Sequence, residues 1–441
     1  MSEKANFRAL LPMIVFLVLF IGTGIALTAT GADMPFYQLS ATVAIIPAIV
    51  LAILQGKDDL NKKIGVFLSG VGEINIITMC MIFLLAGGFA SVASAIGGVK
   101  ATVNFGLSLL PPSMILPGLF LIGAFISTAM GTSMGTVAAI APIAVGVGEQ
   151  TDIPLALLLG VVMSGAMFGD NLSMISDTTI AATRTQGCEM KDKFRMNLLI
   201  ALPAALVTLA LLWFAGASGQ VVKHEEYQFI RVVPYLAILV MALAGVNVFI
   251  VLLAGIVFTG AVCIASVDGY TLIQWSKDIY SGFVGMNEIM VLSMLVGGLG
   301  ELMRYHGGIS WLLERVNGLA RKLSAESPVK AGECCISLLV LLANLCTANN
   351  TVAIILTGKV HEIAVSNGVD RRRSASLLDI FSCVVQGLIP YGAQLLLAGS
   401  IAKLSPLSIA GNNWYCMLLA VAAVFAILFG IPRVRPVRPL A

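Results

Sequence analysis

The stretches STAMGTSMGT (127–136) and FGDNLSMISD (168–177) are polar, yet they lie inside segments that are otherwise as apolar as a lipid chain. An aspartate at the centre of a bilayer costs roughly 2.5–3.5 kcal/mol on insertion scales, so such a side chain is expected to face a protein-lined cavity and to bind something there. Weaker polar stretches recur in the second half, CTANNT (346–351) and SCVVQGLIPYGAQ (382–394). This doubling predicts a membrane transporter with its binding site between two halves of the chain.

The composition fits a chain embedded in lipid. Of the 441 residues, 58% are hydrophobic and 11% are charged, and the mean hydropathy is +0.97. Soluble domains carry about 25% charged residues, so these residues cannot cover a water-facing surface. The composition therefore predicts an all-α polytopic membrane protein, and the net charge of +3, scattered over short loops, gives no indication of nucleic-acid binding.

Apolar runs of about 20 residues, the length that crosses the hydrocarbon core, divide the chain into spans. Single spans are expected at 9–29, 36–55, 67–95, 196–217, 230–243, 246–266, 283–303 and 413–431, with short interfacial stretches at 97–112 and 307–323 and a polar connector at 266–282. Segments 114–147 and 331–366 are long for one helix and short for two, which predicts re-entrant hairpins. Residues 153–183 and 375–403 are expected to be crossings broken at their polar centres.

The order of these elements is the same in residues 1–220 and 221–441, which predicts one structural repeat in each. Placing the basic clusters, among them Arg184–Arg195, in the cytoplasm gives about ten crossings plus two hairpins, with both termini cytoplasmic. The two hairpins then enter the membrane from opposite sides. Inverted repeats with broken helices are typical of secondary transporters, and we expect a multi-pass protein of a bacterial inner membrane.

The first broken crossing carries oxygen ligands for a small cation. Asp170, Ser173 and Asp177 lie at i, i+3 and i+7, which is one face of a helix, and Asn171 and Ser176 lie beside them. Carboxylate, hydroxyl and amide oxygens suit a hard cation such as sodium. A desolvated aspartate that loses its cation favours a proton, so one carboxylate can bind the two ions in turn. A helix cap or a buried, hydrogen-bonded aspartate is the alternative interpretation.

The tips of the two hairpins offer hydroxyl, amide and backbone groups for a substrate. Small residues also let membrane helices pack closely, which is the alternative interpretation of the first tip. Asparagine is not easily left unpaired in lipid, which favours a lining role at the second tip. The candidate residues are Thr132, Ser133 and Thr136 at the first tip, and Thr347, Asn349 and Asn350 at the second.

Other ionisable residues are candidates for gating or proton relay. Glu73 and Glu288 start corresponding spans of the two halves. Asp379, just before the second helix break, is instead a candidate for substrate binding together with the hairpin tips. Lys359 could be an internal counter-ion for one of the acids, or it could extend toward the membrane surface. The sequence contains no P-loop, no plausible catalytic triad and no metal-ligand spacing among its eight cysteines. We therefore expect a carrier driven by an ion gradient, neither an enzyme nor a protein with a resident cofactor.

Two pairs of motifs resemble the NhaC-type sodium/proton antiporter family of the ion transporter superfamily. GTSMGTVAAIAPIAVGV (131–147) and FGDNLSMISDTTI (168–180) are similar to that family's GTSWGT…P and GDNxSPISDTT patterns. TANNTVAIILTGK (347–359) and SLLDIFSCVVQGLIPYG (376–392) are similar to its TGNQYxSIVLPGR and LEDSGTVTSPLIPW patterns. The resemblance implies two inverted repeats, re-entrant hairpins and a homodimer with an elevator-like transport domain.

The resemblance also assigns residues by position. The first motif pair matches at Thr132, Ser133, Asp170, Asn171, Ser173, Ser176, Asp177 and Thr178, and the second at Thr347, Asn349 and Asp379. The chain departs from the family pattern at Met134, Met174, Asn350 and Leu378. Relatives in the superfamily also exchange organic anions and amino acids. Sodium/proton antiport is therefore the first hypothesis, and cation-coupled transport of a small organic acid (malate/lactate-type antiport) or an amino acid is the alternative.

Overall fold

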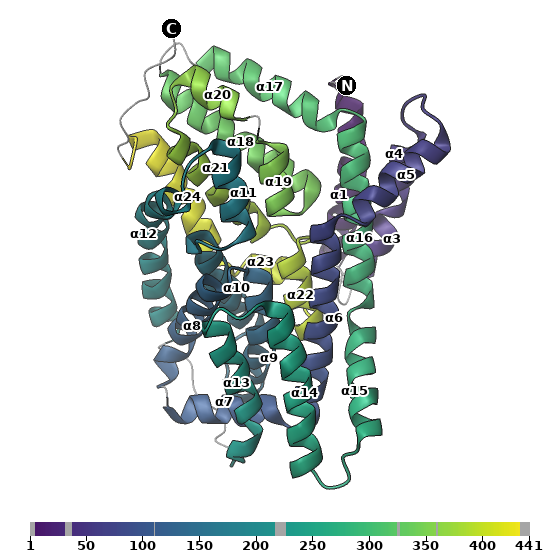
Figure 1. Ribbon diagram of the computed structural model, residues 1–441, viewed down its shortest axis with the longest axis vertical. Coiled ribbons are helices and arrows are strands. Elements are labelled where there is room, and N and C mark those ends of the chain that lie inside the picture. Colours follow the sequence, from purple (N-terminus) through teal and green to yellow (C-terminus); the bar gives the residue numbers. More distant parts are fainter. Residues whose placement is uncertain are drawn as a thin grey trace.

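The computed structural model describes residues 5–30, 38–109, 111–216, 226–323, 327–358 and 360–432, and its regular elements are all helices (Figure 1). By length and composition, six helical segments of these residues can cross a membrane, namely Phe7–Leu27, Ile74–Ala95, Leu155–Gln186, Met190–Gly216, Val248–Ser266 and Pro328–Thr347. The bent pair Leu272–Gly285 and Asn287–Tyr305 would make a seventh. Shorter apolar helices lie among them. The all-helical, polytopic class is confirmed, and the number of crossings stays a prediction.

The helices of the first half are η1 (Phe7–Leu10), α1 (Leu11–Leu17), η2 (Val18–Gly22), α2 (Thr23–Ala29), α3 (Ala41–Ala44), α4 (Ile46–Leu54), α5 (Leu60–Val71), α6 (Ile74–Ala95), α7 (Gly98–Leu109), η3 (Pro112–Met114), α8 (Ile115–Met130), α9 (Ser133–Gln150), α10 (Leu155–Leu172), α11 (Asp177–Gln186) and α12 (Met190–Gly216). Those of the second half are η4 (Phe229–Arg231), α13 (Val233–Leu243), α14 (Val248–Ser266), α15 (Leu272–Gly285), α16 (Asn287–Tyr305), α17 (Gly308–Leu323), α18 (Pro328–Thr347), α19 (Asn350–Leu356), α20 (Val360–Asn367), α21 (Arg371–Gln386), α22 (Ala393–Ala402), α23 (Pro406–Ala410) and α24 (Trp414–Phe429).

In the first half, both polar stretches interrupt a helix. α8 ends before Gly131, which has a φ of 70°, in the left-handed region that glycine adopts without strain. The Thr132 side chain then caps α9 by accepting a hydrogen bond from the Gly135 amide. The Ser176 side chain caps α11 in the same way, through the Thr179 amide. Hydroxyl side chains favour this position because they satisfy amides that the first turn of a helix leaves free.

The second half repeats these interruptions. α18 ends before Ala348, which has a φ of 51°, and the Asn349 side chain caps α19 through the Val352 amide. α21 ends at Gln386, and α22 begins only at Ala393. All four polar stretches therefore break helices, as predicted. The re-entrant course of the α8–α9 and α18–α19 pairs stays a prediction.

The predicted polar connector at 266–282 is wrong for most of its length, because Leu272–Gly285 form helix α15. Thr271 caps this helix, and one side of it is apolar: Trp275 and Ile279 pack against a small cluster of buried residues that includes Val92 of α6. Gly282 allows the backbones of α15 and α6 to approach, since a side chain there would meet the Gly87 carbonyl. An amphipathic helix of this kind has the average composition of a polar loop.

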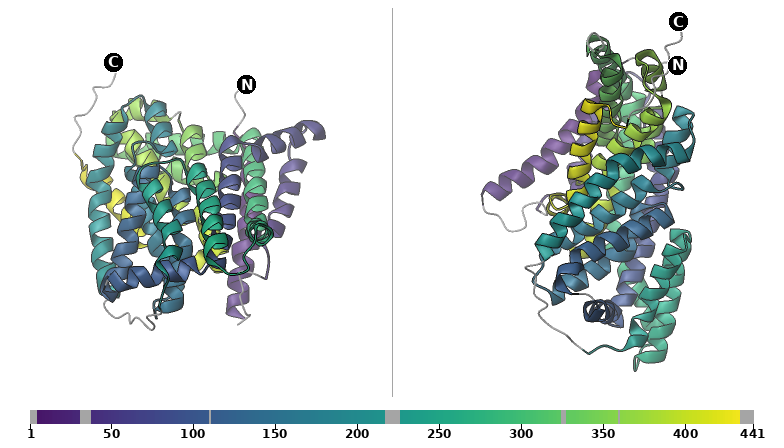
Figure 2. Two further views of the ribbon diagram at one scale, coloured as in Figure 1. Left: turned by 60° about the horizontal axis from the view of Figure 1, so that its bottom comes forward. Right: turned by 90° about the vertical axis from the view of Figure 1, so that its left-hand side faces the viewer.

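The two halves exchange packing partners. α9, after the first tip, packs against α22 of the second half, and α19, after the second tip, packs against α11 of the first. α5 packs against α16 and α6 against α15, while α12 packs against α24. Figures 1 and 2 place the short helices α7 and α17 at opposite ends of the helical body. The polar breaks of both halves are thereby brought together near its centre.

Small residues fix the first break against its neighbour. A side chain at Gly165 or Gly169 of α10 would collide with the backbone carbonyls of Phe120 and Ala124 in α8. This close approach is the usual use of glycine between membrane helices. It lets the Ser173 hydroxyl, just beyond the end of α10, donate a hydrogen bond to the Thr128 carbonyl at 3.0 Å.

Candidate functional site

A cavity of about 80 Å³ lies where the helix breaks of both halves face α6. Seven predicted residues line it, namely Thr132, Ser133, Asp170, Asp177, Thr178, Asn349 and Asn350. Its wall also includes four further polar residues, namely Asn75 and Thr78 of α6, Thr351 of α19 and Gln394 of α22. The structure therefore gathers carboxylate, hydroxyl and amide groups from both halves at one place.

Asp170 lies in the last turn of α10, and only 5% of its surface is exposed. The Ser133 hydroxyl donates to its Oδ2 at 2.6 Å, and Gln394 Nε2 donates to the Ser133 oxygen at 3.1 Å. Gln386 Nε2 donates in turn to Gln394 Oε1 at 2.8 Å. This series of hydrogen bonds links the buried carboxylate to both ends of the second helix break.

Asp177 is the first residue of α11 and borders the same cavity, but it is exposed. At a helix N-terminus its charge also faces the free amides of the first turn, which favour an anion. The two carboxylates predicted to act together thus border one cavity from different environments. Asp170 is buried in its wall, whereas Asp177 is exposed at its border.

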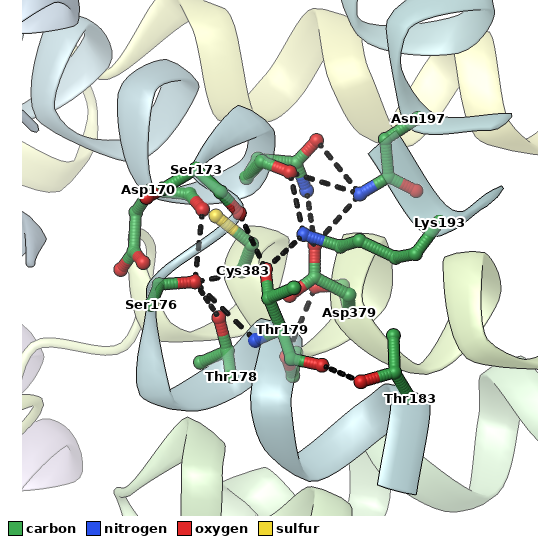
Figure 3. A network of polar contacts seen from close by, with 12 residues as sticks. Asp170, Ser173, Ser176, Thr178, Thr179, Thr183, Lys193, Asn197, Asp379 and Cys383 are labelled. Atoms are coloured by element: carbon green, nitrogen blue, oxygen red, sulfur yellow. Dashed lines mark hydrogen bonds and ion pairs between the residues drawn. The ribbon is translucent and has the colours of Figure 1, made fainter. Parts of the chain in front are cut away.

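Asp379, in α21, belongs to a second buried cluster close to the first break (Figure 3). Lys193 Nζ of α12 lies 2.8 Å from its Oδ2, and neither side chain is more than 1% exposed. Asn197 Nδ2 and Asn171 Nδ2 donate to the same oxygen at 2.7 and 3.1 Å. Three donors therefore hold the Asp379 carboxylate, which does not line the cavity.

The same cluster satisfies backbone groups that the helix break leaves free. Lys193 Nζ donates to the Asn171 carbonyl and to Thr179 Oγ1, both at 2.7 Å, and Asn197 Nδ2 donates to the Asn171 carbonyl at 3.0 Å (Figure 3). Thr179 Oγ1 donates to the Ser173 carbonyl at 2.6 Å. Unpaired carbonyls inside a membrane are costly, so these contacts stabilise the broken geometry next to Asp170.

The position of Lys193 contradicts the prediction that the whole basic segment Arg184–Arg195 lies at the cytoplasmic surface. Lys191, two residues earlier, is 62% exposed, whereas Lys193 is completely buried. Lys359, for which an internal counter-ion and a side chain extending to the membrane surface were the two interpretations, lies outside the described residues. Lys193 is the counter-ion of Asp379. The available signal was the i, i+4 spacing of Lys193 and Asn197, which continues through the buried Ala201 on one face of α12.

Several predicted residues hold the fold beside the cavity instead of lining it. Asn171 contacts Asp379, Ser173 binds the Thr128 carbonyl, and the Ser176 hydroxyl caps α11. The hydroxyls of Thr136 and Thr347 donate to carbonyls one turn earlier in their own helices, Thr132 and Ala343. For these residues the structure favours a positioning role.

Glu73 and Glu288 lie away from the cavity. Glu73 caps α6 by accepting from the Asn75 and Ile76 amides, and it is Asn75 that reaches the cavity. Glu288 accepts from the Ser40 hydroxyl at 2.5 Å and lines a separate cavity of about 340 Å³. Their gating or relay roles stay predictions.

The cavity suits a small hard cation. Its described lining includes two carboxylates but no lysine, arginine, histidine or cysteine, and oxygen ligands select such ions. In the described part of the chain, no three His, Cys, Asp or Glu side chains converge as transition-metal ligands do. A water molecule needs about 10–15 Å³ of such space, so the cavity has room for an ion and a few waters.

An oxygen-lined cavity between broken membrane helices is the arrangement of a secondary transporter. Residues 3–217 match the Na+/H+ antiporter family. The chain is 26% identical to the malate-2H+/Na+-lactate antiporter of Bacillus subtilis, over 95% of each chain. It is also 26% identical to the Na+/H+ antiporter NhaC of Alkalihalophilus pseudofirmus, over 86% of this chain and 87% of that one, and to NhaC of Bacillus subtilis, over 72% and 76%. These matches confirm the resemblance to the NhaC-type antiporter family, and the protein is a membrane transporter, not an enzyme.

Proposed function

We propose that the protein exchanges sodium for protons, and that Asp170 binds the two ions in turn. The observation that carries the proposal is the charge of the cavity: Asp170 and Asp177 border it, and none of its described lining residues is a lysine or arginine. A site with this charge attracts cations and repels anions. Sodium and protons are here transported ions, and the proposal includes no resident cofactor.

The burial of Asp170 explains why exchange would be coupled. An ionised carboxylate that is 5% exposed and has no cation beside it is unstable in a surrounding of low polarity. Either a sodium ion or a proton neutralises it, and one excludes the other. Thr132, Thr178 and Asn349 border the same space and would supply further oxygens to a sodium shell. Only the neutralised site is then suited to move between the two sides of the membrane.

The proposal includes two inverted-topology repeats, residues 1–220 and 221–441, which form about ten crossings and two re-entrant hairpins. The exchange of packing partners supports it, because α9 contacts α22 as α19 contacts α11. The opposite positions of α7 and α17 support it as well (Figure 1). We place the protein in a bacterial inner membrane with both termini cytoplasmic, and we expect the homodimer that the family resemblance implies.

Cation-coupled exchange of a small organic acid is the second candidate. It is favoured by the match to the malate-2H+/Na+-lactate antiporter, which covers 95% of both chains. The amides of Asn349 and Asn350 could hold a substrate carboxylate at the cavity. Against this candidate, the buried Lys193 is engaged by Asp379 and does not line the cavity.

Purified protein in proteoliposomes separates the two candidates. Internal pH is read after a gradient of sodium, lithium or potassium is applied, with and without malate, lactate, arginine or ornithine. We expect sodium to drive proton movement without any of the organic compounds, because only cations match the charge of the cavity. Proton movement that requires one of these compounds would contradict sodium/proton antiport and support the organic exchanger. Protein-free liposomes are the control for passive leakage of protons.

A further inference from the structure

An apolar cavity of about 320 Å³ lies at the end of the molecule where α7 passes below α9 and α13 (Figure 1). Its walls come from α7, α8, α9 and α13 and consist of aliphatic side chains, glycines and the ring of Phe105, with one exception, Thr102. The Thr102 hydroxyl donates to the Gly98 carbonyl at 2.7 Å and is thereby satisfied within α7. The cavity therefore has no polar group to offer, and its natural occupant inside a bilayer is a hydrocarbon chain.

A polar cavity of about 250 Å³ lies at the same end of the molecule. Lys100 and Asn104 of α7 line it together with Arg231 of η4, Tyr227 and the carboxylate of Glu226. Within the part of the chain that the structure describes, neither Lys100 nor Arg231 forms an ion pair. Two cationic side chains and one anionic side chain leave this cavity with a net positive charge.

The two cavities are neighbours along α7. Lys100, Val103 and Leu107 lie at i, i+3 and i+7 and therefore share one face of the helix. Lys100 borders the polar cavity, whereas Val103 and Leu107 border the apolar one. The Tyr227 ring, on the polar side, contacts the Phe105 ring, on the apolar side, with centroids 6.1 Å apart.

The second helix repeats this order. Arg231 is the last residue of η4, two positions before α13 begins at Val233, and Leu236 and Leu239 of α13 line the apolar cavity. Their positions are about 7.5–12 Å further along the helix axis. A basic group thus precedes apolar lining on both α7 and α13.

We propose that the two cavities together bind one anionic phospholipid, with its phosphate between Lys100 and Arg231 and one acyl chain in the apolar cavity. Basic pockets between membrane helices are known to take anionic headgroups, and aromatic residues such as Tyr227 and Phe229 commonly lie at that depth. The net positive charge favours a lipid of charge minus one over a zwitterionic lipid. The bound chain would fill the space between α13 and the α8–α9 pair, whose tip carries Ser133.

Native mass spectrometry of the detergent-purified full chain, with phosphatidylglycerol or phosphatidylethanolamine added, tests the proposal. The wild-type protein is expected to retain phosphatidylglycerol preferentially. The double variant Lys100→Ala, Arg231→Ala is expected to bind it about twenty-fivefold more weakly, because each basic residue near a lipid headgroup contributes about fivefold. The matched control is Lys57→Ala with Lys277→Ala, which removes two exposed lysines elsewhere and is expected to leave binding unchanged.

A separate variant tests the acyl chain. Gly106 lines the apolar cavity, and a Cβ added there meets no atom within 4 Å, so the side chain of Gly106→Leu would start in open space. It is expected to lower phosphatidylglycerol retention while the thermal stability of the lipid-free protein is kept. Gly65→Leu, at an equally open glycine of α5, is the control. The proposal is wrong if the basic double variant and Gly106→Leu both retain phosphatidylglycerol as the wild type does. Recognition of the headgroup is excluded if the wild type binds phosphatidylglycerol and phosphatidylethanolamine equally.

Discussion

Asp170→Asn is expected to reduce sodium-driven proton movement in proteoliposomes about a hundredfold or more. The amide has nearly the same shape, and its oxygen can still accept the hydrogen bond from Ser133. It has no negative charge for sodium, however, and no proton to release. Losing one partner of a buried charge pair costs about 3–5 kcal/mol, which corresponds to this loss of rate or affinity. The measurement is the initial rate of internal pH change after a sodium gradient is applied.

Two further variants test whether the loss of exchange is specific to Asp170. Asp152→Asn, at an exposed aspartate between α9 and α10, is expected to behave as the wild type does. Asp177→Asn is expected to weaken the response to low sodium but to leave exchange measurable, because Asp177 is exposed. If the Asp177→Asn variant is inactive and the Asp170→Asn variant is active, Asp177 binds the ion and Asp170 does not.

Lys193→Met is expected to destabilise the protein by about 3–5 kcal/mol, because it leaves the Asp379 carboxylate buried without its cation. The carbonyl of Asn171 and the hydroxyl of Thr179 each also lose one hydrogen-bond donor. Because these groups shape the first break beside Asp170, exchange per folded molecule should fall as well. Thermal unfolding in detergent gives the first quantity, and proteoliposome flux at matched protein content gives the second.

A second buried ion pair serves as the control. Arg373 binds Glu333 through two hydrogen bonds of 3.1 Å and also donates to the Ile431 carbonyl, and none of these residues lines the cavity. Arg373→Met should cost similar stability, but the molecules that remain folded should exchange normally. Lys193→Met combined with Asp379→Leu should recover stability without recovering exchange. If that double variant exchanges sodium and protons as the wild type does, Lys193 has only a structural role.

The helix breaks could be predicted because their chemistry is local. Gly131 supplies a left-handed residue, and Thr132 and Asn349 cap the helices that follow, so polarity and small size at these positions suffice. Asp170 could be predicted for a related reason. A carboxylate within an apolar segment has few destinations other than a cavity.

The features that could not be predicted, Lys193, Gln394 and helix α15, depend on burial, which composition does not report. Lys193 counts as one more loop charge when basic residues are summed, although its neighbour Lys191 is 62% exposed and Lys193 is not exposed at all. Gln394 lies in a stretch that was recognised as polar, yet its contact with Ser133 joins residues from different halves and has no local signal. Helix α15 was missed because its apolar side is narrow and its other side resembles a connector.

Proton release on sodium binding tests the central claim most directly. Sodium chloride is added to the purified protein in weakly buffered detergent solution, and a pH indicator is followed, with choline chloride as the control salt. If Asp170 binds sodium and a proton in turn, the wild type releases protons in a saturable manner and the Asp170→Asn variant does not. Saturable sodium binding without proton release, or unchanged release from Asp170→Asn, would contradict the account.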